Sequence, residues 1–154
     1  MRVLILRGVP GAGKTTYLKT YSENYVVCSA DDHFIVDGKY EFRPELLPEA
    51  HAACLRKFIR LIADRYETPG LNIAIDNTNL TIAEIAPYAA IALAYGCELE
   101  ILTLKTDPMI AAPRNVHGVD EKTVEQMYKR MNAEALRFPP WWRHRQEYPP
   151  KMAA

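Results

Sequence analysis

The sequence has no net charge and no long apolar run, and these two absences narrow the class of protein. Its 154 residues include 19 Lys and Arg and 19 Asp and Glu, so no strong basic field indicates nucleic-acid binding across the whole surface. No apolar run approaches the length that a membrane span needs. The opening MRVLILRG contains an apolar run that is too short for the core of a signal peptide. We therefore expect a cytoplasmic protein with no membrane partner.

Cysteine is also scarce. Cys28, Cys54 and Cys97 lie in apolar contexts and show no CxxC spacing, which is typical of buried, reduced thiols. With 49% hydrophobic and 25% charged residues, the chain has the composition of an ordinary globular protein. Its length predicts one domain over residues 1–154, and no repeat or linker divides it.

Strand-like and helix-like segments alternate along the chain. Short apolar runs predict strands at residues 3–6, 25–28, 71–75 and 98–104. Helical patterns follow at residues 14–21, 44–62, 82–95 and 120–136, the third of them with a capping box formed by Thr81 and Glu84. This alternation predicts an α/β fold, a three-layer sandwich around a mostly parallel sheet of four or five strands.

Two segments fall outside the alternation. The stretch FIVDGKYEF places Asp37-Gly38 between two short β-prone pieces, which predicts a β-hairpin insertion. The tail, residues 138–154, is too rich in proline for a regular helix and contains Trp141-Trp142. These indoles, like Tyr40 and Phe42 of the hairpin, could stack on bases. Packing against the domain is the commoner outcome for such aromatic side chains.

The segment from Gly8 to Thr15 matches the pattern G-x-x-x-x-G-K-[ST], between a buried strand and a helix. Such a loop lets backbone N–H groups converge on phosphate oxygens at a helix N-terminus. Lys14 would reach the β- and γ-phosphates, and the Thr15 hydroxyl would hold Mg²⁺. A merely tight turn would need neither of these side chains. We therefore predict ATP and Mg²⁺ as cofactors, bound by Gly8, Gly11, Ala12, Gly13, Lys14, Thr15 and Thr16.

Asp76 ends the third predicted strand, in the sequence IAIDNTN. In proteins with a phosphate-binding loop, a carboxylate on a strand beside the first commonly lies near the metal. The alternative is that Asp76 caps the turn together with Asn77 and Asn79. Residue 77 is Asn, where a hydrolytic motor would place a water-activating Glu, so the sequence favours phosphoryl transfer to an acceptor.

Two adjacent carboxylates, Asp31 and Asp32, follow the second predicted strand in YVVCSADDHF. The carboxyl ends of parallel strands meet at one edge of the sheet, so this pair should face the same crevice as the phosphate-binding loop. A carboxylate there could accept the proton of an attacking hydroxyl. Because successive side chains diverge, we expect one Asp to be catalytic and the other to bind backbone amides or a metal-bound water. The alternative is that both cap a loop.

Together these pieces resemble the P-loop kinase domain of polynucleotide 5′-hydroxyl kinases and the small ATPases related to it. The matching motifs are GVPGAGKTT, SADDHF, IDNTN and RNVHG, and they span roughly residues 1–135. The resemblance implies a P-loop kinase-like fold with a lid at about residues 107–120. It also implies that Asp31 is the general base, that Asp76 helps to place the acceptor, and that Arg114 of the lid touches the transferred phosphates.

The chain departs from the pattern of the bacteriophage polynucleotide kinases, here called the phage-type pattern, in the residues that would bind the acceptor. Phe34 stands where an Arg would grip the acceptor's 3′-phosphate, and His117 and Gly118 follow in the lid where a second Arg is usual. Pro113 should break any helix that leads into the lid. The side chains that remain as candidates for acceptor binding are Asp32, Asn77, Asn79 and His117.

These observations predict an ATP-dependent kinase that phosphorylates a hydroxyl acceptor, with the 5′-hydroxyl of a nucleic acid as the first candidate. The missing Arg at residue 34 leaves a second candidate open, a kinase for a nucleoside, sugar or antibiotic. A third is a nucleotide-dependent binding module with little turnover. The choice between ATP and GTP and the oligomeric state stay open.

Overall fold

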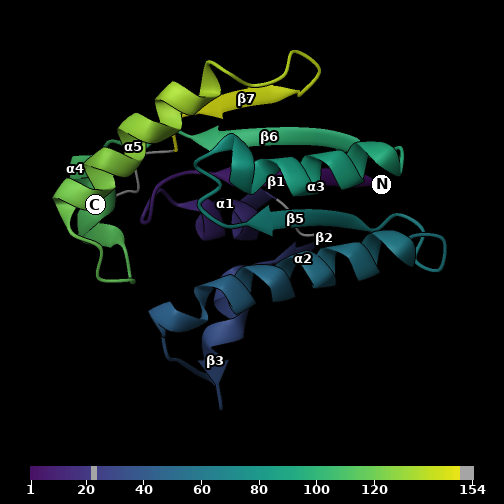
Figure 1. The fold of residues 1–154 in the computed structure, drawn as a ribbon, viewed down its shortest axis with the longest axis horizontal. Helices are drawn as coiled ribbons and strands as arrows, with labels where there is room; N and C mark the ends of the chain where they lie inside the picture. The colour runs from purple at the N-terminus through teal and green to yellow at the C-terminus, as the bar shows by residue number, and fades with distance from the viewer. Residues whose placement is uncertain (22–23, 150–154) are drawn as a thin grey trace.

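Five parallel strands form the centre of the molecule in the computed structural model, which describes residues 1–21 and 24–149 (Figure 1). The sheet has the order β2-β5-β1-β6-β7. Its first strand pairs with both neighbours, so that Ile5 lies opposite Ile75 on one side and Ile101 on the other. The strands are β1 (Arg2–Arg7), β2 (Tyr25–Cys28), β5 (Asn72–Asp76), β6 (Glu98–Leu104) and β7 (His144–Glu147).

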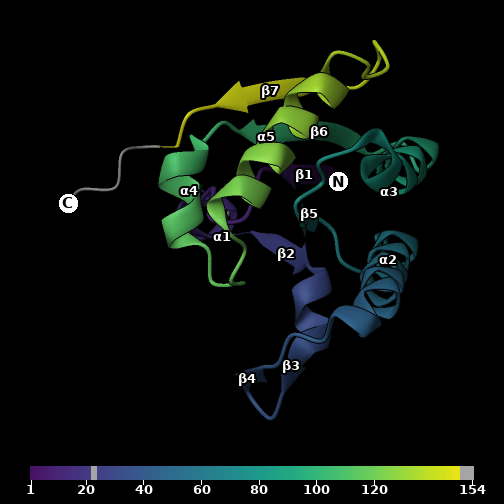
Figure 2. The same ribbon diagram turned by 60° about the vertical axis from the view of Figure 1, so that its left-hand side comes forward.

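Helices cover both faces of the sheet, as Figure 2 shows, and give the three layers that the sequence predicts. Successive side chains of β1 point to opposite faces, so Ile5 joins one apolar cluster and Leu6 the other. The first cluster contains α2 (Leu47–Ala63) and α3 (Ile82–Ala94). The second contains α1 (Lys14–Tyr21), α4 (Pro108–Arg114) and α5 (Glu121–Ala135).

The helix patterns read from the sequence are confirmed. The stripe Ala50, Cys54, Phe58 and Ile62 is the buried face of α2, which follows a 3₁₀ turn, η2 (Pro44–Leu46). The capping box before α3 is present, because Thr81 accepts from the backbone of Glu84 and the Glu84 carboxylate accepts from the backbone of Thr81. All three cysteines are buried and unpaired. Among the described residues, no helix combines the length and apolar composition needed to cross a membrane.

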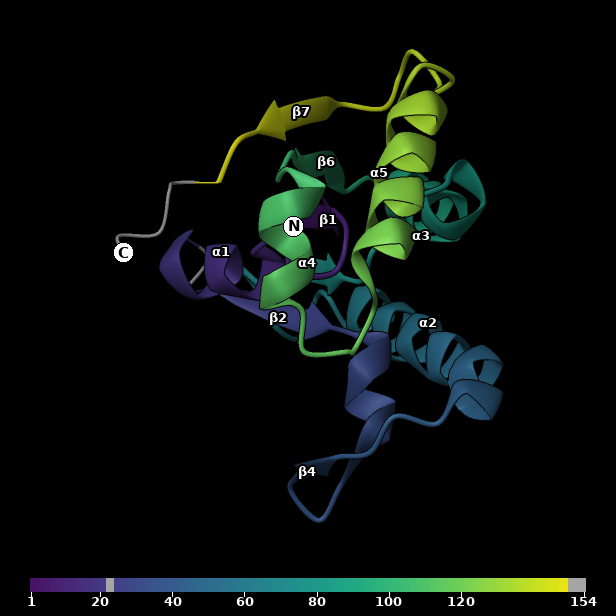
Figure 3. The same ribbon diagram turned by 90° about the vertical axis from the view of Figure 1, so that its left-hand side faces the viewer.

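The predicted hairpin is present and projects from the body of the molecule (Figure 2, Figure 3). Strands β3 (Ile35–Val36) and β4 (Lys39–Tyr40) are antiparallel and joined by Asp37 and Gly38, both with positive φ. The hairpin follows the acidic segment directly, because Asp31 and Asp32 lie in the 3₁₀ helix η1 (Ala30–Phe34). The sequence order therefore brings the hairpin beside the end of β2.

The prediction about Pro113 was wrong, because this proline lies inside α4 rather than ending a helix before it. The helix starts at Pro108, whose fixed φ suits a first turn, and the Asp107 carboxylate caps it at Met109 N with a bond of 2.8 Å. Only Arg114 follows Pro113 within α4. The missing N–H therefore costs this short helix a single bond in its last turn.

The proline-rich tail contributes a fifth strand, which no apolar pattern in the sequence predicts. Strand β7 pairs with β6 at the edge of the sheet, and Arg145 reaches across to Glu100 at 2.9 Å. The indole of Trp142 packs on Phe138 with the ring centres 5.4 Å apart, whereas Trp141 is 72% exposed. The preference for packed indoles is therefore right for one Trp only. Residues 150–154 of the predicted tail lie outside the described residues.

Candidate active site

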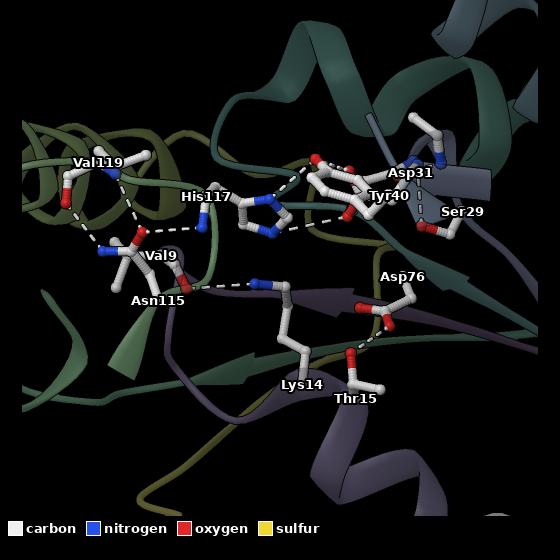
Figure 4. A network of polar contacts seen from close by, with 12 residues as sticks. Val9, Lys14, Thr15, Ser29, Asp31, Tyr40, Asp76, Asn115, His117 and Val119 are labelled. Carbon is white, nitrogen blue, oxygen red and sulfur yellow. Dashed lines mark hydrogen bonds and ion pairs between the residues drawn. The ribbon is translucent and has the colours of Figure 1, made fainter. Parts of the chain in front are cut away.

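The phosphate-binding loop connects β1 to α1, as its sequence requires. The Lys14 ammonium donates to the carbonyls of Gly8 at 3.0 Å and Val9 at 3.1 Å, so it lies folded over its own loop (Figure 4). Burial lowers the pKa of Lys14, and the carboxylates of Asp76 and Asp31 oppose this effect. A partly buried ammonium near two carboxylates is well placed to meet a polyanion such as a triphosphate.

The loop is fixed in place by backbone contacts. Gly8 donates its N–H to the Thr78 carbonyl at 3.0 Å, and the Thr106 hydroxyl donates to the Ala12 carbonyl at 2.8 Å. Gly11 has a φ of 81°, and a Cβ on it would lie 2.0 Å from the Ala111 carbonyl oxygen of α4. Glycine is therefore required at residue 11 both for its conformation and for the close approach of α4.

Thr15 and Asp76 meet at the end of β5. The Thr15 hydroxyl donates to the Asp76 carboxylate at 3.0 Å. Burial raises the pKa of Asp76, with Lys14 acting in the opposite direction. Both side chains offer the oxygen ligands that Mg²⁺ takes, and Mg²⁺ commonly needs only one or two protein groups besides phosphate oxygens and waters. They therefore fit a Mg²⁺ held between protein and triphosphate, where the ion would neutralise charge on the phosphates. Within the described residues, no group of three or more His, Cys, Asp or Glu side chains forms a metal cage.

The side chains of Asn77 and Asn79, which the sequence offered for acceptor binding, both make hydrogen bonds within the framework. Asn77 accepts the N–H of Ala30 at 2.9 Å and so ties the β5 end to η1. Asn79 is 1% exposed and donates to the carbonyl of Leu6 at 2.7 Å. Its φ of 48° marks a tight turn that an Asn tolerates. Sequence alone could not show that these amides point inward.

The two adjacent carboxylates diverge as expected. Asp31 donates its backbone N–H to the Ser29 hydroxyl at 3.2 Å, which caps η1, and its carboxylate faces the lid and the hairpin. Asp32 turns toward α2, where its carboxylate lies 3.6 Å from the Lys57 ammonium. That ammonium also donates to the Val27 carbonyl at 2.6 Å. Asp31 therefore faces Tyr40 and His117, whereas Asp32 is paired with the Lys57 ammonium.

The loop after α4, in the segment that the sequence predicts as a lid, is organised by Asn115, a residue with no assigned role in the sequence reading. Its side-chain amide donates to the carbonyls of Ala112 and Val119, and its oxygen accepts the N–H groups of His117 and Val119. These four bonds hold residues 115–119 in one compact turn. The imidazole of His117 consequently points from the lid toward Asp31 (Figure 4).

Tyr40 connects the hairpin to both sides of this contact. Its hydroxyl donates to Asp31 Oδ1 at 3.3 Å and lies 2.9 Å from His117 Nδ1. His117 Nε2 lies 3.7 Å from Asp31 Oδ2. The sequence reading gave Tyr40 two roles, stacking on bases or, more commonly, packing against the domain. Its position after the Asp37-Gly38 turn brings it back toward η1, which is the signal that could have suggested this contact.

Two cavities flank the phosphate-binding loop. The first, the Tyr17 cavity, has about 60 Å³ and is lined by Ala12, Gly13, Thr16, Tyr17, Thr20, Tyr21, Arg114 and Pro149. The second, the Asp31 cavity, has about 450 Å³ and is lined by Thr15, Leu18, Lys19, Val27, Ser29, Asp31, Asp32 and Asp76. Arg114 of the lid thus shares a cavity with Gly13 and Thr16 of the loop. Asp31, Asp76 and Thr15 share the other.

This arrangement separates two tasks around one loop. The Tyr17 cavity has an aromatic wall, which suits stacking against a flat ring. The Asp31 cavity has carboxylates that could accept the proton of a hydroxyl. The site therefore has the parts for phosphoryl transfer from a nucleotide to an alcohol.

Comparisons with known proteins agree with this geometry. A family model described as an AAA domain matches residues 3–136. Human NEDD4-binding protein 2 is 32% identical over 134 residues, which cover 81% of this chain and 7% of that protein. Human YLP motif-containing protein 1 is 24% identical over 151 residues, again with 7% of its length covered. The chain thus spans only a small part of the curated relatives that it matches.

Among solved structures, the Pnkp1/Rnl/Hen1 RNA repair complex contains a chain that superposes with a TM-score of 0.64 at 15% identity, covering 90% of this chain and 46% of that one. The resemblance to polynucleotide-kinase-like P-loop proteins and the predicted P-loop kinase-like α/β fold are thereby confirmed.

Proposed function

The chain belongs to the AAA_33 family of AAA domains, and from the geometry of its site we propose that it is an ATP-dependent kinase that transfers the γ-phosphate to a hydroxyl acceptor. The 5′-hydroxyl of a nucleic acid or oligonucleotide is the acceptor that we propose first. One observation carries the proposal: Asp31 lines the same cavity as Thr15 and Asp76, across from the loop that holds Lys14. A hydrolytic motor would place its water-activating Glu directly after Asp76, where this chain has Asn77.

In the proposed reaction the acceptor hydroxyl enters the Asp31 cavity and donates its proton to the Asp31 carboxylate as its oxygen attacks the γ-phosphorus. The bond from that phosphorus to the bridging oxygen of ADP breaks, and ADP leaves with the negative charge. Lys14, and Arg114 when the lid is closed, would stabilise the charge on the phosphate oxygens. A Mg²⁺ held by Thr15 and Asp76 would neutralise part of that charge. A base in the role of Asp31 is typically worth ~10²–10⁴ in rate.

A nucleic-acid acceptor is supported by the motif order and by the likeness to a chain of an RNA repair complex. It is also compatible with the shape of the site, since the Asp31 cavity is wide and its carboxylate is 52% exposed. An open cavity can admit the end of a long chain, whereas a closed pocket would admit only a small molecule.

A small-molecule acceptor is the second candidate, and two observations favour it. Phe34, at the position where the phage-type kinases grip a phosphate, is only 2% exposed and belongs to the apolar core. The Asp31 cavity carries three carboxylates, Asp31, Asp32 and Asp76, which repel a second phosphate. A gluconokinase from Sinorhizobium meliloti 1021 shares the fold with a TM-score of 0.56 at 13% identity, covering 94% of this chain and 82% of that one.

The deciding experiment measures transfer of label from [γ-³²P]ATP to DNA and RNA oligonucleotides with a free 5′-hydroxyl. Matched oligonucleotides that already carry a 5′-phosphate are the substrate control, and Asp31→Asn is the protein control. We expect label on the hydroxyl oligonucleotides only, and loss of most of it in the variant. If no oligonucleotide is labelled but a panel of nucleosides and sugars stimulates ADP release, the second candidate is right. ATP binding with no acceptor in either panel would reject the kinase proposal.

A further inference from the structure

We propose that Tyr40 and His117 are positioning residues for Asp31, so that the base is oriented only when the hairpin and the lid meet over it. The inference rests on the proposed function, because it gives Asp31 the role of the base. The sequence analysis named His117 only as a candidate for acceptor binding and did not connect it with Tyr40. The contact between these two side chains links the hairpin to the lid, 77 residues apart in sequence.

Three contacts carry the proposal, and Figure 4 shows them around one carboxylate. Tyr40 reaches Asp31 Oδ1 at 3.3 Å, His117 Nε2 lies 3.7 Å from Asp31 Oδ2, and Tyr40 and His117 are 2.9 Å apart. Each carboxylate oxygen thus faces one of the two side chains. Rotation of the Asp31 carboxylate would lengthen both contacts, so together they favour one orientation.

Both partners of Asp31 are themselves held. The Tyr40 ring packs edge-on against Phe34 with the ring centres 6.2 Å apart, and Phe34 is part of the core. His117 receives support from Asn115, whose oxygen accepts its backbone N–H at 3.2 Å. The imidazole and the Tyr40 ring also contact each other, at 5.5 Å between centres. The orientation of Asp31 therefore derives from the core on one side and from the lid on the other.

The number of protons in the cluster explains why both side chains are needed. The Tyr40 hydroxyl has one proton, which can go to Asp31 or to His117 Nδ1 but not to both. When it goes to Asp31, a proton on Nδ1 can be donated to the Tyr40 oxygen; when it goes to Nδ1, a proton on Nε2 can face Asp31 Oδ2. In both arrangements Tyr40 and His117 contact each other, so loss of either side chain leaves the other without one of its contacts.

The contacts leave room for the reaction. A carboxylate has about four lone-pair sites, and Tyr40 and His117 use at most two of them. Asp31 can therefore accept an acceptor hydroxyl while it stays held. Orientation matters at this point, since a displacement of about 1 Å at a reacting group can cost ~10²-fold in rate.

The first test is kinetic and uses variants that separate the contacts. Tyr40→Phe removes the hydroxyl and keeps the ring. His117→Asn keeps a donor near the position of Nδ1, and His117→Gln keeps one near Nε2. We expect kcat to fall between ~10-fold and ~100-fold in Tyr40→Phe, with KM for ATP unchanged and with no further loss when His117→Asn is added. Tyr66→Phe, which removes an exposed hydroxyl at the other end of the sheet, is the matched control.

A kcat for Tyr40→Phe within twofold of the wild type would overturn the proposal. So would an equal loss in kcat and in ATP affinity, because that pattern would indicate general damage to the site. Rescue of the kcat of a His117→Ala protein by His117→Gln, toward the wild-type value, would support a donor at Nε2 as the feature that Asp31 requires.

The second test needs no acceptor. Backbone hydrogen exchange is followed in residues 115–119 of the lid and 35–40 of the hairpin, for the wild type and for Tyr40→Phe. We expect both segments to exchange faster in the variant, while β1 is unaffected. Unchanged exchange in both segments would overturn the proposal whatever the enzyme phosphorylates. Faster exchange together with failure to label any acceptor would uphold the contact and reject only the proposed function.

Discussion

The two sides of the phosphate-binding loop are built in different ways. On the donor side, backbone groups fix the loop: Gly8 bonds the Thr78 carbonyl, and Gly11 touches the backbone of Ala111 in α4. On the acceptor side, partly exposed side chains of the hairpin and lid meet around Asp31. A site built from backbone suits a ligand that does not vary, such as a triphosphate. A site built from side chains on insertions can change its acceptor without disturbing the loop.

The support beneath the donor side shows the same contrast. Arg7, at the end of β1, is fully buried and donates to the carbonyls of Asn79 at 3.0 Å and Leu80 at 2.7 Å and to the Met131 carbonyl. Burial lowers the pKa of Arg7 to about 10. This one guanidinium ties β1 to the β5 loop and to α5. Among the described residues around Asp31, the charged partners are at least 30% exposed instead.

The largest effect should come from exchanging the two adjacent carboxylates one at a time. Asp31→Asn removes the proposed base and should lower kcat by ~10²–10⁴-fold. Asp32→Asn loses only a half-exposed ion pair to Lys57 and should change kcat by less than ~5-fold. Initial rates at saturating ATP and acceptor give the comparison. Similar losses in the two variants would show that the divergence of the pair has no functional meaning.

The donor side can be tested through its tightest contact. Gly11→Ala combines a positive φ with a Cβ 2.0 Å from a backbone oxygen, so α4 must move away from the loop. We expect a loss of roughly 2–4 kcal/mol in the free energy of unfolding, together with weaker ATP binding. Gly70→Ala is the matched control, since its φ of 82° is similar but no atom lies within 4 Å of its Cβ. It should lose only about 1 kcal/mol and bind ATP normally.

Denaturant titration and ATP titration of the two glycine variants measure both effects. If Gly70→Ala is destabilised as much as Gly11→Ala, the positive φ alone explains the result. The close approach of α4 would then contribute nothing to the free energy of unfolding, and the contrast between the two sides of the loop would lose its main evidence.

The donor side was also the part that the sequence predicted well. The phosphate-binding loop, the apolar strands and the capping box of Thr81 and Glu84 depend on residues that lie close together in the chain. Local patterns are sufficient for such features, because spacing alone determines which groups meet. The Asp37-Gly38 hairpin belongs to the same class, since its turn is set by two adjacent residues.

The parts that the sequence did not reveal depend on contacts between distant residues. Strand β7 has no apolar alternation and is held at the sheet edge by contacts such as the pair of Arg145 with Glu100, 45 residues away. The role of Tyr40 depends on a lid 77 residues further along the chain. The burial of Asn79 could not be predicted from the sequence for a related reason. Its burial is decided by Leu6, whose carbonyl it meets only after β1 and β5 have paired.

The smallest effect that we predict concerns His144, which lies below the donor side on β7. Burial lowers its pKa from 6.5 to about 4, and the charges of Arg7 and Lys105 act in the same direction. Its Nε2 meets the Thr103 hydroxyl at 2.7 Å. Between pH 6.5 and pH 4 the unfolded chain therefore binds a proton at this residue that the folded chain does not bind.

The sign of the effect follows from this difference in proton binding. The free energy of unfolding should fall as the pH drops from 6.5 toward 4, and His144 should add no further loss below the lower value. Thermal unfolding of the wild type and of His144→Gln across this range measures it, with His51→Gln as the control on an exposed histidine. The wild type should lose stability more steeply than His144→Gln and in parallel with His51→Gln. Parallel curves for all three proteins would mean that water reaches His144. Arg7, but not His144, would then count as a buried group beneath the donor side of the loop.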